Sequence, residues 1–166
     1  MKKLLFSVVM LILVSAVFAQ NDTIQAPYKR FKSFPPVKLM LPDSVSTFTN
    51  LNLDKKKPVM LMLFNPQCEH CQHETEELIK NIDKFKNIQI LMVTSMVFDS
   101  MLTFREKYKL ADYKNIVVAH DVNFSLISYF MIHNLPFLAF FDKKKELISV
   151  FEGGLQMDKI LKIFDK

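Results

Sequence analysis

Residues 59–71 read VMLMLFNPQCEHC, and the predicted architecture follows from them. The run Val59–Phe64 is apolar throughout, which is typical of a strand covered on both faces of a parallel sheet. After Cys71 the pattern becomes helical, because apolar residues between Leu78 and Phe85 recur on one face. The sequence therefore predicts a buried strand that turns into a helix at its two cysteines.

Strands and helices alternate along the rest of the chain, with a short β lead-in before the first buried strand. Strands that alternate with helices require parallel crossovers. The predicted fold class is therefore α/β, with a central mixed sheet and helices on both faces. Besides the elements above, we expect strands at 38–41, 47–53, 88–94, 116–119, 137–141 and 147–151, and helices at 100–108, 123–132 and 157–164.

Length and composition limit the possible functions. The 166 residues suffice for one domain, and 50% of them are hydrophobic, so a core can form. Gly153 and Gly154 are the only glycines, which excludes a Walker A loop and a GxGxxG dinucleotide motif. The formal net charge of +5 is spread among acidic residues, and we expect no nucleic-acid partner.

The first residues have the features of a secretory signal peptide. Lysines at the start precede the apolar run Leu4–Phe18, and Ala19 stands before a polar segment. The run is shorter than the roughly 20 residues that span a bilayer, so we expect cleavage and no membrane span afterwards. An uncleaved N-terminal anchor is the alternative. The expected location is periplasmic or extracellular, and the expected divisions are a signal peptide at 1–19, an extended lead-in at 20–35 and one domain at 36–166.

Cys68 and Cys71 are the only cysteines, and they stand where the buried strand becomes a helix. Unpaired N–H groups and the positive end of the helix dipole favour a thiolate at Cys68. Cys71, one turn later, lies on the same side but is more enclosed. We expect Cys68 to attack a partner's disulfide and Cys71 to resolve the mixed disulfide. A purely stabilising disulfide is the alternative, although so small a loop constrains little chain entropy.

Three neighbours of Cys68 are expected to tune its thiolate, namely Pro66, Glu69 and His70. A protonated His70 would stabilise the thiolate and make the disulfide more oxidising. A solvated, neutral His70 would have little effect, and the sequence leaves both possibilities open.

Two segments resemble the hallmarks of the thioredoxin fold. They are the Cys-Glu-His-Cys motif after Val59–Phe64, and Asn134-Leu135-Pro136 before the apolar run Phe137–Phe141. Over roughly residues 35–166, including the Gly153-Gly154 break, the chain is similar to exported TlpA/ResA-like thiol–disulfide oxidoreductases of the redoxin group.

The resemblance implies a thioredoxin-like fold and a cis peptide bond before Pro136. It also implies that Leu135 and Pro136 position the backbone of a bound peptide. We therefore expect an enzyme whose chemistry resides in the Cys68–Cys71 pair, so that it needs no cofactor. Its expected partners are protein dithiols or disulfides and an unidentified electron donor or acceptor.

The sequence departs from the thioredoxin pattern at two positions. Gln67 replaces the usual tryptophan, and Met62 stands where thioredoxin has a buried acidic residue that helps to deprotonate the second thiol. The proton of Cys71 must then pass to water, to Glu69 or to Glu74, or leave slowly. The sequence does not choose among these routes.

The direction of electron flow and a rival function also stay open. A histidine between the two cysteines is a feature that this chain shares with oxidising proteins of the fold. The overall architecture instead resembles that of reductants, and we favour the reducing direction. The rival is a thioredoxin-like copper or metal chaperone that uses both cysteines and a histidine, although such proteins usually space the cysteines by three residues. A peroxidase is disfavoured because residues 65–68 do not reproduce a Thr-x-x-Cys motif. The candidate histidine ligands are His73, His120 and His133.

Overall fold

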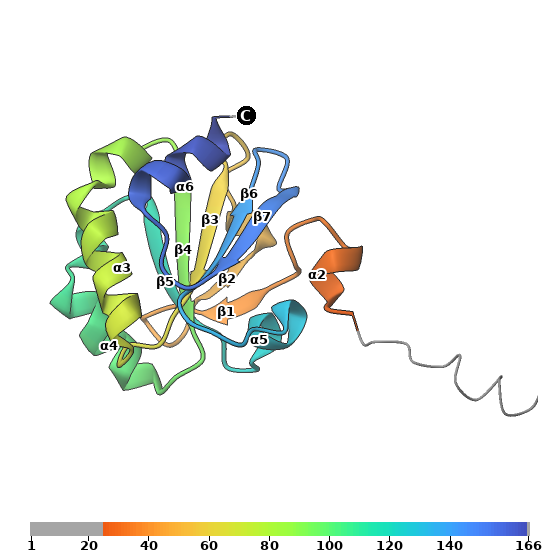
Figure 1. Cartoon of the computed structure of the whole chain (residues 1–166). Helices are drawn as coiled ribbons and strands as arrows, with labels where there is room; N and C mark the ends of the chain where they lie inside the picture. Colours follow the sequence, from red (N-terminus) through yellow and green to blue (C-terminus); the bar gives the residue numbers. More distant parts are fainter. Residues whose placement is uncertain (1–24, 166) are drawn as a thin grey trace, which may run out of the picture.

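The computed structural model describes residues 25–165, so the expected signal peptide lies outside the described residues. One seven-stranded sheet has the order β2-β1-β5-β4-β3-β6-β7 (Figure 1). The strands are β1 (Lys38–Met40), β2 (Thr47–Thr49), β3 (Val59–Leu63), β4 (Gln89–Thr94), β5 (Ile116–His120), β6 (Phe137–Phe141) and β7 (Leu147–Glu152). The α-helices are α2 (Pro27–Arg30), α3 (Glu69–Lys80), α4 (Phe98–Lys107), α5 (Ser125–Phe130) and α6 (Met157–Phe164).

Four chain segments meet where the central strands end, at the carboxyl-terminal ends of the parallel strands. Strands β3, β4 and β5 run parallel, whereas β6 is antiparallel to β3. Leu63 at the end of β3 is opposite both Val93 of β4 and Phe137 of β6. The carboxyl ends of β3, β4 and β5 therefore share an edge with the start of β6. Open α/β sheets bind ligands at such an edge.

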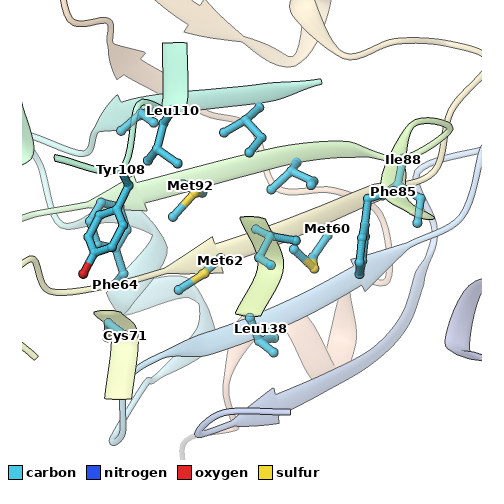
Figure 2. Packing of buried hydrophobic residues seen from close by; sticks show 14 of the residues in the cluster. Met60, Met62, Phe64, Cys71, Phe85, Ile88, Met92, Tyr108, Leu110 and Leu138 are labelled. Carbon is cyan, nitrogen blue, oxygen red and sulfur yellow. The ribbon is translucent and has the colours of Figure 1, made fainter. Parts of the chain in front are cut away.

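Alternation along the strands divides the core into two layers. In β3, Met62 belongs to one buried cluster and Leu61 to the other, because successive side chains point to opposite faces. Helices α3, α4 and α6 pack on the first face, and α5 with the lead-in packs on the second (Figure 1). The predicted mixed sheet with helices on both faces is confirmed. Figure 2 shows that Cys71 belongs to the first cluster, together with Met62 and Leu138.

Two N-terminal segments differ from the prediction. The lead-in is not extended throughout, because Pro27–Arg30 forms the short helix α2, with proline at a helix start where its missing N–H costs nothing. The strand expected at 47–53 ends at Thr49, and Asn50–Asn52 forms a 3-10 turn. The Asn52 side chain accepts a hydrogen bond from the Thr49 N–H at 2.8 Å, which competes with strand pairing.

The last part of the lead-in is attached to the β6–β7 hairpin. The Phe34 N–H donates to the Lys145 carbonyl at 2.8 Å, and the Leu147 N–H donates to the Lys32 carbonyl at 2.6 Å. The buried Phe34 ring lies 4.7 Å from the Phe141 ring, centroid to centroid. The charges and prolines of this segment did not predict its contacts with the hairpin.

Candidate active site

The first cysteine caps helix α3 at the turn that follows β3. The Asn65 side chain accepts a hydrogen bond from the Gln67 N–H at 2.9 Å, and the Cys68 N–H donates to the Asn65 carbonyl at 3.0 Å. This turn leaves Cys68 as the N-cap residue, with Glu69 in the first helical turn. Cys68 is half-buried, so a partner's sulfur can approach its thiol at the end of the helix where an anion is stabilised.

The second cysteine has a different environment. Cys71 is completely buried, and burial is the main cause that raises the pKa of its thiol to about 12. The nearby Cys68 and Glu74 also raise it, whereas a backbone hydrogen bond at Asn65 acts in the opposite direction. Both cysteines are free thiols in the structure. The structure thus places one accessible and one enclosed sulfur a helical turn apart.

The loop before β6 lies against the first cysteine. The Leu135–Pro136 peptide bond is cis, and Leu135 O lies 3.9 Å from Cys68 Sγ, within reach of a weak S–H···O hydrogen bond. Leu135 is half-buried and Pro136 is buried. The Gly153 N–H donates to the Pro136 carbonyl at 2.8 Å, which ties this loop to the end of β7. The structure therefore brings the cysteine pair and the Leu135–Pro136 pair together.

A buried carboxyl group stands one turn beyond the second cysteine. Glu74 is only 5% exposed and follows Cys71 at the i+3 position of α3, so the two side chains are neighbours on one helix face. Glu74 Oε2 accepts a hydrogen bond from the Leu155 N–H at 3.0 Å, whereas Oε1 has no partner among the described residues. Burial raises the pKa of Glu74 to about 7, which the Leu155 hydrogen bond opposes and Glu77 reinforces.

The structure separates the two carboxyl groups that the sequence left as alternatives. Glu69 is exposed in the first turn of α3, whereas Glu74 is enclosed beside Cys71. The spacing from Cys71 was the signal in the sequence. Nothing local indicated that residues 154–155, about 80 positions away, would bury the carboxyl group.

A polar groove of about 620 Å³ opens over Glu74 between α3 and the start of α6. Its walls carry both histidines of α3, His70 and His73, together with a second carboxylate, Glu77. Both histidines are exposed. The groove therefore connects the buried carboxyl group with solvent. The remaining lining residues are Asn81, Gly154, Leu155, Gln156, Met157 and Asp158.

The expected tuning residues lie around Cys68 in different settings. His70 and Glu69 are exposed, so water screens their charges. Pro66 is buried, and its carbonyl accepts a hydrogen bond from Gln72 Nε2 at 2.9 Å. Their effect on the thiolate stays a prediction.

The histidines considered as metal ligands are not gathered with the cysteines. His133 Nδ1 lies 3.7 Å from Glu152 Oε1, and the His120 ring packs edge-on to Phe98 at 5.7 Å between centroids. Within residues 25–165, no three or more His, Cys, Asp or Glu residues are arranged to hold a metal ion.

Comparison with known proteins supports a redox assignment. Residues 32–157 match the model of the AhpC/TSA family, whereas a comparison with curated proteins finds no match. The exposed lipoprotein thioredoxin Etrx1 of Streptococcus pneumoniae strain TIGR4 is 26% identical, with a TM-score of 0.61 over 77% of this chain and 96% of that chain.

Two further solved structures show the same fold. The MTB protein dsbF is 21% identical, with a TM-score of 0.65 over 77% of this chain and 92% of that chain. A secreted Mycobacterium tuberculosis disulfide oxidoreductase homologous to E. coli DsbE is 15% identical, with a TM-score of 0.64 over 77% of this chain and 93% of that chain. These likenesses confirm the predicted thioredoxin-like fold.

Proposed function

The chain belongs to the AhpC/TSA family and is a thiol–disulfide oxidoreductase of the thioredoxin fold, and we propose that it acts outside the cytoplasm. There it reduces disulfides of secreted or envelope proteins, as TlpA/ResA-like proteins do. One observation carries the proposal, namely the unequal exposure of the two sulfurs. Cys68 is half-buried at the N-cap of α3, and Cys71 is wholly buried one turn later. An accessible sulfur that attacks and an enclosed sulfur that resolves are what disulfide exchange requires.

The exchange begins at the accessible sulfur. The Cys68 thiolate attacks one sulfur of the partner's disulfide, so that a Cys68–partner S–S bond forms while the partner's own S–S bond breaks. The released partner sulfur leaves as a thiolate and takes a proton from water. In this proposal the Leu135 carbonyl, which lies 3.9 Å from Cys68 Sγ, accepts a hydrogen bond from a partner's backbone N–H.

The buried sulfur completes the exchange. Cys71 loses its proton, and its thiolate attacks Cys68 Sγ, so that the Cys68–Cys71 bond forms and the partner's second sulfur leaves as a thiolate, which is then protonated. The partner gains two electrons and becomes a dithiol, whereas this protein becomes a disulfide. A dithiol donor must then reduce Cys68–Cys71 before the next turnover. In this proposal the electrons pass through the two cysteines alone, without a cofactor.

Glu74 is the proton acceptor for Cys71 in this proposal. With the pKa of the buried thiol at about 12, attack near neutral pH needs a base close by. Glu74 is a neighbour on the same helix face, one of its carboxylate oxygens has no hydrogen-bond partner among the described residues, and its pKa of about 7 suits a base at that pH. Met62 is fully buried and apolar at the position where thioredoxin has its acid, so we assign that task to Glu74.

The reducing direction is supported by the same burial. Strong disulfide oxidants such as DsbA owe their potential to a stabilised reduced form. Cys71 stays a protonated thiol near neutral pH, so no thiolate at this position stabilises the reduced form, and the charge of the exposed His70 is screened by water. We expect a potential nearer to that of thioredoxin, about −270 mV, than to that of DsbA, about −120 mV. Equilibration with glutathione measures it, and a value near that of DsbA would contradict the reducing role.

A location outside the cytoplasm is supported by the expected signal peptide at 1–19 and by the similar proteins described as exposed or secreted. Among residues 25–165, no helix combines the length and apolar character that a bilayer crossing requires. Fractionation of cells that express the full chain, followed by mass determination of its N-terminus, tests the export and the expected cleavage after Ala19.

The decisive experiment traps the partner. Replacing Cys71→Ser removes the resolving sulfur, so a mixed disulfide should accumulate on Cys68, and mass spectrometry of the trapped complex identifies the partner. The matched control is Cys68→Ser, which should trap nothing. Equal trapping by both variants would show that the sulfurs are not differentiated. Tight, stoichiometric copper(I) binding without reduction of insulin disulfides would instead favour the metal chaperone.

A further inference from the structure

We infer that Gly154 and Leu155 are positioning residues that hold the Glu74 carboxylate beside Cys71. This inference rests on the proposed role of Glu74 as the base for the resolving thiol. The Gly153-Gly154 pair marks the break between β7 and α6. Besides connecting β7 to α6, the second glycine of the pair, Gly154, contributes to the active site.

Leu155 supplies the hydrogen bond that fixes the carboxylate. Its backbone N–H donates to Glu74 Oε2 at 3.0 Å, leaving Oε1 without a partner among the described residues. The donor is a main-chain group, so its position depends on the path of the chain between β7 and α6. The buried Met157 at the first position of α6 anchors this path on the C-terminal side.

Gly154 supplies the space that the carboxylate occupies. A Cβ atom built on Gly154 would lie 2.8 Å from Glu74 Oε2 and 3.9 Å from Cδ. The first distance is shorter than a Cβ atom can tolerate, so any side chain at 154 must displace the carboxylate or the loop. The carboxylate gives way more easily, because it is the end of a flexible side chain. Gly154 is not among the residues with positive φ, so alanine there does not meet the strain of a left-handed backbone.

The same segment borders the groove that leads to solvent. Gly154 and Leu155 line the groove together with Glu74, His70 and His73. A proton that Glu74 receives from Cys71 can leave to water through this groove. The segment thus sets the position of the carboxylate at the point where it faces both the buried thiol and the solvent.

Gly154→Ala tests the inference through the step that uses Glu74. The reduced protein is mixed with an aryl disulfide whose released thiolate absorbs visible light, and stopped-flow absorbance resolves two phases. The first phase reports attack by Cys68, and the second reports release of the remaining aryl thiolate by Cys71. In Gly154→Ala we expect an unchanged first phase and a second phase about tenfold slower or more near neutral pH, because removal of a general base costs at least that factor.

Two controls separate positioning from a general effect on the fold. Gly154→Ala should keep the wild-type circular dichroism spectrum and a single cooperative unfolding transition. In a Glu74→Ala background, where no carboxylate is left to displace, adding Gly154→Ala should not slow the second phase further. A wild-type second phase in Gly154→Ala, or an equal further loss in the Glu74→Ala background, would overturn the inference.

The outcomes also distinguish this inference from the proposed function. Loss of the first phase in the wild-type protein would contradict the role of Cys68 itself. If Glu74→Gln slows the second phase and Gly154→Ala does not, Glu74 is the base but Gly154 does not position it. If neither variant slows the second phase, the proposed role of Glu74 fails and the positioning inference fails with it.

Discussion

Glu74→Gln should remove a pH-dependent penalty from the folded state of the reduced protein. Burial raises the pKa of this carboxyl group from 4.5 in the unfolded chain to about 7 in the folded chain. The unfolded chain therefore releases the proton first as pH rises, and the free energy of unfolding falls between about pH 4.5 and 7. Below that window the carboxyl group is neutral in both states and imposes no penalty.

The magnitude follows from the difference between the two pKa values. At about 1.4 kcal/mol per pH unit, a rise from 4.5 to about 7 costs about 3 kcal/mol once both states are ionised. Between pH 5 and 8 the wild-type protein should lose about 2–3 kcal/mol of stability through this group alone. Glutamine is uncharged at every pH and can still accept the hydrogen bond from the Leu155 N–H, so the variant should lack this part of the slope.

Urea denaturation of both proteins at several pH values from 5 to 8, under reducing conditions, measures the effect. The upper limit keeps the assay below the range in which Cys71 ionises in the unfolded chain, where its pKa is 9.0. Glu76→Gln is the matched control, because it makes the same change at an exposed position two residues away on α3. If Glu74→Gln follows wild type and Glu76→Gln at every pH, the burial of Glu74 imposes no penalty and the reasoning is wrong.

Three further outcomes follow from the structure. In the reduced protein at pH 8, iodoacetamide should modify Cys68 much faster than Cys71, because Cys71 is buried and its pKa is about 12. Peptide mass spectrometry measures both rates, and equal rates would contradict the roles assigned to the two cysteines. Gly153→Ala should lower the free energy of unfolding by about 1 kcal/mol or more, because φ of +96° suits glycine alone; unchanged urea denaturation would refute this. Leu78→Ala should lower the free energy of unfolding by about 2–5 kcal/mol because it leaves a cavity under α3, whereas Leu51→Ala, at an exposed position, should lower it little. Similar losses in both variants would contradict the packing of Leu78 in the core.

The sequence determined the architecture because the relevant information is local. The apolar run Val59–Phe64 and the helical pattern after it predicted β3 and α3, and the structure confirms both. The two cysteines follow at the turn between them, so their placement at a helix start required no knowledge of distant contacts. The strand predicted at 47–53 was wrong beyond Thr49. Alternating residues indicate a strand only when no side chain competes for the backbone hydrogen bonds.

The identity of the carboxyl group beside the buried thiol depends on contacts between distant parts of the chain. Both Glu69 and Glu74 lie on α3 near Cys71, and although the i+3 spacing favours Glu74, only its burial distinguishes the two carboxyl groups chemically. That burial depends on Leu155 and Gly154, which reach α3 because the chain returns through β6 and β7 before α6 begins. A desolvated carboxylate is a property of all the groups that surround it in space, and sequence periodicity records only the neighbours along one helix or strand.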